Sequence, residues 1–240
     1  MFSFVQESHG SDYSGSGGTT IATSADAHTA GNMLVVCTRG ATVGTIVTSV
    51  TDTAGNAYRR VGRSALSGSD MELWYAQNIT GHATNVVTAT FNGSIAFRSI
   101  ICAEFTGEPL VLVEQIPSII GERTLPTSFT ITTPAFTTLF ADELIVYAAQ
   151  IDQLSTTWTP ETNFTAAFSD GTLSLNYRVV SAIQTAVTIT ATNSANNSRD
   201  ILAATFVDAA AYGGGGGSPG GSPGGSPGVG TETGFATVGG

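Results

Sequence analysis

The chain has 240 residues, of which 41% are hydrophobic and only 11% are charged, which is enough apolar material for one large domain or two small ones. Its formal net charge is −10, and because an acidic surface repels phosphate backbones, nucleic-acid binding is excluded as an expected function. All eight basic residues are arginines, so chemistry that needs a lysine amine is also excluded, including isopeptide cross-links, Schiff bases and the P-loop.

Short hydrophobic runs separated by Gly, Asn, Asp and Ser predict strands joined by turns in the first half of the chain. The segment Thr51–Tyr58 (TDTAGNAY) predicts a hairpin whose turn is formed by Gly55 and Asn56. The predicted strands are Phe2–Glu7, Thr19–Thr23, Met33–Arg39, Ile46–Asp52, Ala57–Val61, Met71–Asn78, Val86–Phe91 and Ser99–Phe105.

The second half shows the same pattern, and no segment of the chain has the 3.6-residue period of a helix, so the predicted fold class is all-β. Its predicted strands are Leu110–Gln115, Ser128–Thr132, Glu143–Ile151, Phe164–Phe168, Leu173–Val180, Val187–Thr192 and Ile201–Val207.

The two halves repeat each other at a spacing of about 100 residues, which indicates a tandem duplication. The matching segments are Asn32–Thr38 with Asp142–Ala148, Met71–Phe91 with Leu173–Thr192, and Arg98–Phe105 with Arg199–Phe206. Each unit has enough strands for a two-sheet antiparallel β-sandwich, so we expect one module over 1–108 and a second over 109–210. The equivalent core positions expected from this alignment are Leu34 with Leu144, Leu73 with Leu175, and Ile100 with Ile201.

Residues 211–240 form a third region, a Gly/Ser/Pro-rich arm. The stretch Gly213–Gly228 (GGGGGSPGGSPGGSPG) has no side chains that could build a core, and we expect an extended strap. After the strap, one residue in two falls on the same face of an extended strand, namely Val229, Thr231, Thr233, Phe235 and Thr237. This pattern favours an arm that adds to the sheet edge of a neighbouring copy; the alternative is a disordered tail.

The strings AGNMLVV (Ala30–Val36), SDMELWYAQNI (Ser69–Ile79), FRSIICAEFTG (Phe97–Gly107) and ADELIVYAAQ (Ala141–Gln150) carry a resemblance to a known group. The chain resembles tandem jelly-roll or Ig-like β-sandwich proteins, which occur among phage structural proteins and bacterial extracellular surface or filament proteins, mostly without an assigned activity. The resemblance covers residues 1–210. It implies the fold more directly than it implies a function.

Three aromatic residues are candidates for stacking against a glycan: Trp74, Tyr75 and Trp158. Because Trp74 and Tyr75 are adjacent in a strand, they should point to opposite faces, one into the core and one into solvent. The alternative role for all three is packing between sheets. Cys37 and Cys102 each lie in an apolar strand, which predicts either two buried free thiols or one inter-strand disulfide.

No set of residues in the sequence predicts an enzyme, a cofactor or a metal site. The histidines lack metal-ligand spacing, and Asp52 and Asn56 could serve as calcium ligands but are better explained by a turn that needs no metal. The histidines are His9, His28 and His82. The carboxylates considered as a glycosidase pair are scattered: Glu72, Glu104, Glu143 and Asp152.

These features together predict a non-enzymatic structural subunit of a large homo-oligomeric assembly, as a virion surface or tail component. The expected partners are other copies of the chain, capsid or tail proteins, and surface glycans. The start, MFSFVQESHG, shows no secretory signal, so we expect either a protein that stays in the cytoplasm until assembly or lysis or a numbering that begins after a removed leader. No apolar run reaches the length of a membrane span, so membrane insertion is not expected, and the expected location is a virion or an extracellular surface. The alternatives are a secreted bacterial filament or surface-layer subunit, and a glycan-binding β-sandwich module.

Overall fold

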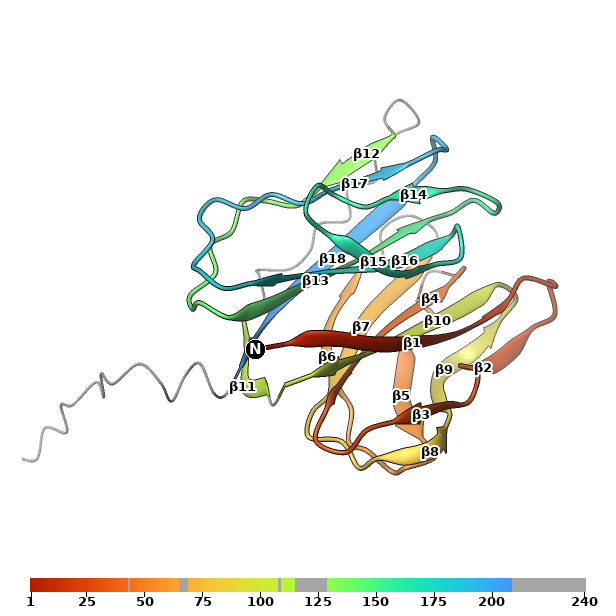
Figure 1. Cartoon of the computed structure of the whole chain (residues 1–240). Coiled ribbons are helices and arrows are strands. Elements are labelled where there is room, and N and C mark those ends of the chain that lie inside the picture. Colours follow the sequence, from red (N-terminus) through yellow and green to blue (C-terminus); the bar gives the residue numbers. More distant parts are fainter. Residues whose placement is uncertain (43, 65–68, 108, 115–128, 209–240) are drawn as a thin grey trace, which may run out of the picture.

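A computed structural model describes residues 1–42, 44–64, 69–107, 109–114 and 129–208 (Figure 1). These residues form eighteen strands and no helix, which confirms the all-β prediction. Accordingly, the described part of the chain contains no helix of the length and hydrophobicity needed to cross a membrane. Every strand pairing is antiparallel.

The first half contains a five-stranded sheet, here called the first inner sheet, and a three-stranded sheet, the first outer sheet. The inner sheet has the order β1 (Ser3–Asp12), β10 (Arg98–Thr106), β4 (Met33–Gly40), β7 (Asp70–Ala76) and β6 (Arg59–Ser64). The outer sheet has the order β2 (Gly18–Ala22), β9 (Val87–Ile95) and β5 (Val47–Asp52), and a short pair is formed by β3 (Asp26–His28) and β8 (His82–Asn85).

The second half repeats this strand order. Its inner sheet has the order β11 (Pro109–Glu114), β18 (Arg199–Asp208), β13 (Glu143–Ile151), β16 (Leu173–Val180) and β15 (Thr165–Ser169). Its outer sheet has the order β12 (Thr130–Thr132), β17 (Thr190–Asn193) and β14 (Trp158–Thr159).

The sheets stack in four layers, with the two inner sheets facing each other in the middle (Figure 1). The central cluster between them combines side chains of both halves, for example Val35 and Phe105 with Val146 and Phe206. Each outer sheet covers the other face of its own inner sheet. The central strands are therefore apolar on both faces, which explains why their sequences read as continuous hydrophobic runs and not as alternating ones.

Fifteen of the eighteen strands lie where the sequence predicts one, and the bounds of β13 and β16 agree to the residue. The strands that the sequence analysis missed are β3, β8 and β14, which have two to four residues and no apolar run. The predicted hairpin at Thr51–Tyr58 is wrong. A turn does form, in which the Gly55 amide donates to the Asp52 carbonyl at 3.2 Å, but β5 and β6 belong to different sheets and the segment crosses between layers.

The sequence alignment of the two halves is off by one residue at its first segment. Leu34 packs in the outer cluster of the first half, whereas Leu144 packs in the central cluster, so the two do not occupy equivalent faces. The strand pairing makes Ile145 the counterpart of Leu34. The other two expected pairs do share a face, Leu73 with Leu175 in the central cluster and Ile100 with Ile201 in the outer clusters.

Candidate functional site

One end of the central cluster is polar. Side chains alternate between the two faces of a strand, so every second residue of an inner-sheet strand points into the junction between the halves. At this end of the sheets, the next residue in that series after the last apolar one is polar. In β4 this residue is Arg39, two positions after Cys37. The buried residues at this end, here called the polar cap, are Arg39, Ser99, Gln150 and Asp200.

Hydrogen bonds across the polar cap connect the two halves. The Tyr13 hydroxyl, just after β1, donates to Asp170 Oδ2 at 2.5 Å and also contacts the hydroxyl of Thr172 in the second half. Burial, together with the nearby Asp170 charge, raises the pKa of Tyr13, so the phenol stays protonated and acts as a donor. Within the second half, Gln150 Nε2 donates to Asp200 Oδ2.

Arg39 is the cation of the polar cap, and its side chain is only 3% exposed. Its Nη2 donates to Asp152 Oδ1 at 3.2 Å, whereas Nε and Nη1 are buried and have no hydrogen-bond partner among the described residues. Burial lowers the pKa of Arg39, and the charges of Asp152 and Asp170 act in the opposite direction. A guanidinium remains protonated under these conditions, so a positive charge with unused donors lies at the junction.

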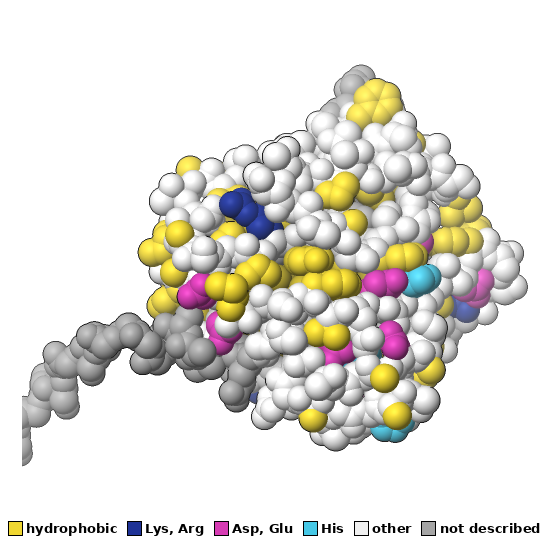
Figure 2. All heavy atoms as spheres, viewed as in Figure 1, with side chains coloured by type: hydrophobic (Ala, Val, Ile, Leu, Met, Phe, Trp, Pro, Cys, Tyr) yellow, Lys and Arg dark blue, Asp and Glu magenta, His cyan; other side chains and the backbone are white. Residues whose placement is uncertain are grey.

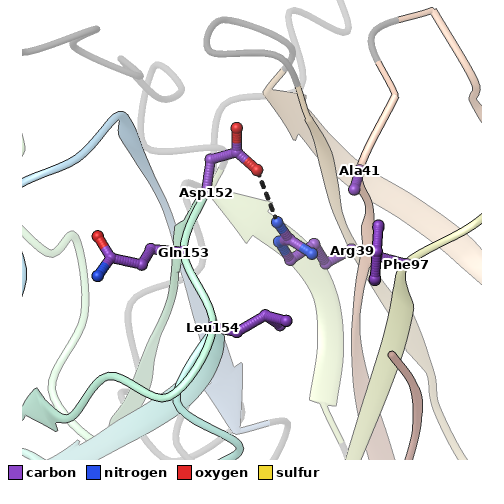
Figure 3. A pocket seen from close by; sticks show the side chains of 6 residues that line it. All are labelled: Arg39, Ala41, Phe97, Asp152, Gln153 and Leu154. Atoms are coloured by element: carbon purple, nitrogen blue, oxygen red, sulfur yellow. Dashed lines mark hydrogen bonds and ion pairs between the residues drawn. The ribbon is translucent and has the colours of Figure 1, made fainter. Parts of the chain in front are cut away.

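A pocket of about 160 Å³ opens beside this guanidinium (Figure 3). It lies at the junction because each half contributes one side of it. The lining residues are Arg39, Ala41 and Phe97 from the first half and Asp152, Gln153 and Leu154 from the second. In Figure 3 the Arg39 guanidinium lies between the Asp152 carboxylate and the Leu154 side chain, with the Phe97 ring on the other side.

The three aromatic residues predicted to stack against a glycan are all buried. Trp74 is 9% exposed, Tyr75 5% and Trp158 7%. The expectation that one of Trp74 and Tyr75 is exposed is wrong, because both faces of the first inner sheet are covered. Tyr75 packs in the central cluster, Trp74 in the first outer cluster and Trp158 in the second, so the three rings do not share one face.

The two cysteines are buried free thiols, as the first of the two sequence interpretations expected. Cys37 packs in the central cluster and Cys102 in the first outer cluster, on opposite faces of the same sheet. Burial raises the pKa of both thiols.

Asp52 forms a network within the protein. Its carboxylate accepts hydrogen bonds from the Asn56 backbone and side chain, from the Tyr58 hydroxyl and from Asn85 Nδ2, at 2.7–3.0 Å. These contacts match the turn that needs no metal. Within the described residues, no group of three or more His, Cys, Asp or Glu is arranged to hold a metal ion.

The scattered carboxylates do not gather. Glu72 accepts from the Val47 amide at 2.8 Å, and Glu104 accepts from Asn32 Nδ2 at 2.7 Å, both inside the first half. Glu143 accepts from the Phe140 amide at 2.6 Å in the second half. Asp152 alone among the four lines the pocket, together with Arg39, which the sequence analysis did not single out. The sequence feature that could have revealed Arg39 is its position two residues after Cys37, which makes it a charged residue on the core-facing side of an apolar strand.

A second surface feature lies where β1 and β15, each at the edge of its inner sheet, come close together. Phe4 stacks on Tyr177 with ring centroids 5.0 Å apart, and His9 stacks on Phe168 at 3.6 Å. A band of hydrophobic side chains crosses this face of the molecule (Figure 2). We call it the seam; its partly buried residues are Phe4, Ala167, Phe168, Tyr177 and Val179.

No protein-family model, no curated protein and no solved structure matches this chain. The function must therefore be argued from the residues and geometry described above. The arm residues Val229, Thr231, Thr233, Phe235 and Thr237, which the sequence analysis assigned to assembly, lie outside the described residues.

Proposed function

We propose that the chain is a non-enzymatic structural subunit of a large homo-oligomeric assembly, a virion surface or tail component, whose C-terminal arm contacts neighbouring copies. The observation that carries this proposal is the seam, a band of partly buried aromatic and aliphatic side chains beside the edge strand β15. An exposed strand edge next to apolar surface is a template for adding a strand from another chain.

The edge strand β15 of the second inner sheet suits this role better than β6, which is an edge strand of the first inner sheet. Its sequence, Thr165–Ser169 (TAAFS), has no charged residue and no proline, two of the devices by which proteins block strand addition. The strand is short, and its register with β16 shifts between Ala166 and Phe168, so it offers only a few main-chain groups to an added strand. In contrast, β6 carries three arginines, Arg59, Arg60 and Arg63. Charged side chains on an edge strand are one of the devices that block the addition of another strand.

The sequence after the last strand supplies a suitable occupant. Val229–Gly240 alternates like a strand and bears one aromatic anchor, Phe235. Residues 209–228 could span at most about 70 Å when extended, enough to reach another copy. Burying one Phe contributes about 1.5–3 kcal/mol, whereas ordering each residue of the arm costs about 1–2 kcal/mol. Main-chain hydrogen bonds to β15 must therefore contribute much of the binding.

We further propose that the two halves are duplicated β-sandwich modules of the jelly-roll or Ig-like kind, spanning 1–108 and 109–210. The repeated strand order supports this, as does the equivalent placement of Ile100 and Ile201. A body with two similar halves and several sheet edges suits a repeating assembly. A secreted bacterial filament or surface-layer subunit uses the same features and is the alternative; electron micrographs of the purified material distinguish a capsid or tail from an endless fibre.

Deleting Gly213–Gly240 tests the arm. The truncated protein should keep its β-sheet circular dichroism and thermal unfolding, because every described strand ends before Gly213, yet it should sediment as smaller species than the full chain. Phe235→Ala should act in the same direction, more mildly. A truncated protein that assembles as well as the full chain would remove the support for an assembly arm.

A further inference from the structure

The pocket at the junction is lined by polar and apolar side chains that have no part in the proposed assembly through the arm. Its walls combine an aromatic ring, Phe97, and an aliphatic side chain, Leu154, with the ion pair between Arg39 and Asp152. Leu154 is 45% exposed, so part of its apolar surface is open to a ligand.

The Arg39 guanidinium has donors to spare. A guanidinium carries five N–H donors, and here the described residues accept from Nη2 only, while Nε and Nη1 are buried without a partner. Unused buried donors are costly to a fold. Because Arg39 makes a single hydrogen bond, to Asp152, a small shift toward a ligand breaks no other hydrogen bond among the described residues.

Asp152 supplies the complementary acceptor. Its side chain is 45% exposed, so the carboxylate can accept from a ligand hydroxyl while it remains paired with Arg39. Gln153, also exposed, adds an amide that both donates and accepts. The pocket therefore presents donors and acceptors side by side, next to the face or edge of an aromatic ring.

The charges around the pocket disfavour an ionic ligand. Asp152, Asp170 and Asp200 all act on the one Arg39 cation, and the whole chain is acidic, so an anion would meet repulsion. A cation would have to compete with Arg39 for Asp152. A neutral molecule that donates and accepts several hydrogen bonds avoids both costs.

We propose that this pocket binds a single neutral sugar ring, such as the terminal residue of a surface glycan. Hydroxyl groups would accept from Arg39 and donate to Asp152, and the apolar C–H face of the ring would pack on Phe97. The volume, about 160 Å³, is below the roughly 300–1,000 Å³ of pockets for drug-sized ligands, so one ring fits and a longer chain would extend into solvent. This site does not depend on assembly, and a subunit on a particle surface would use it for weak, multivalent attachment.

Saturation-transfer-difference NMR on the full chain tests the proposal. The probes are glucose, galactose, mannose and N-acetylglucosamine, with acetate and inorganic phosphate as charged probes. We expect at least one neutral sugar to bind with millimolar affinity and to show saturation at its ring C–H protons. Phe97→Ala and Asp152→Asn should each weaken that binding by about tenfold or more.

The matched control is Phe129→Ala, which removes an exposed aromatic side chain that does not line the pocket, and should leave binding unchanged. Thermal unfolding shows whether each variant is folded. Should Phe97→Ala fail to fold, Gln153→Ala, at an exposed position, provides the second variant and should also weaken binding. Absence of binding by all four sugars, unchanged binding in the folded pocket variants, or binding of acetate or phosphate alone would overturn the proposal.

Discussion

Arg98 in β10 and Arg199 in β18 make the same contact in the two halves of the molecule. Arg98 Nε donates to the backbone carbonyl of Thr20 at 2.8 Å, and Arg199 Nη1 donates to that of Thr130 at 3.2 Å. Thr20 and Thr130 hold equivalent positions in β2 and β12 by strand register. Each arginine therefore ties an outer sheet to its inner sheet from a nearly buried position.

Replacing Arg98 should destabilise the protein strongly. Its guanidinium also donates to the Ser16 and Ile95 carbonyls and pairs with Asp12 at 2.7 Å. Arg98→Ala leaves these acceptors without their donor, and we expect the free energy of unfolding to fall by about 3 kcal/mol, measured by denaturant unfolding. Arg59→Ala, at an exposed position, is the control and should change the free energy of unfolding by less than about 0.5 kcal/mol. Equal effects of the two variants would contradict this reading.

Stability should depend on pH through Asp52. Burial raises the pKa of this carboxyl, but hydrogen bonds from Asn85, Asn56 and Tyr58 outweigh it, and the pKa in the folded protein is lowered. The carboxylate therefore contributes stability above its unfolded pKa of about 3.9, and that contribution is lost as the pH falls through the folded value. Asp52→Asn should flatten the dependence of unfolding free energy on pH below about 4. An unchanged slope in the variant would show that the network does not favour the ionised form.

The cysteine thiols should be inert in the folded protein. Cys37 and Cys102 are buried, and burial raises the pKa of both thiols, so the reactive thiolate is scarce and inaccessible. Ellman's reagent should label neither residue under native conditions and both in guanidinium chloride. Rapid native labelling of either thiol would mean that the sheets open far more readily than their packing implies.

A charge on the edge strand should impair assembly without unfolding the protein. Ala166 in β15 is exposed, and Ala166→Lys places a cation on the edge proposed to receive the arm. We expect smaller species in analytical ultracentrifugation and an unchanged melting temperature. Thr132→Lys, at an exposed position on the edge strand β12 of the second outer sheet, is the matched control. Equal assembly of both variants would point to another edge.

Local sequence determined the strands and their order along the chain. Runs such as Glu143–Ile151 and Leu173–Val180 are strands from end to end. Their apolar residues favour a buried strand regardless of which other strands pack against them. The repeated pattern likewise predicted two similar halves, and it was misaligned only where Leu34 faces the outer cluster and Leu144 the central one. A continuous hydrophobic run has no alternation that could reveal which face is which.

Which faces are covered, and which distant residues meet, was decided only by tertiary structure. Trp74 and Tyr75 point in opposite directions, as adjacent strand residues must, but both are buried because one inner sheet is sandwiched between two others. Arg39 and Asp152 are 113 positions apart and meet only because the two inner sheets pack face to face. Period-two alternation within one strand carries no information about the strand opposite, so the pocket could not be found without the packing of the halves.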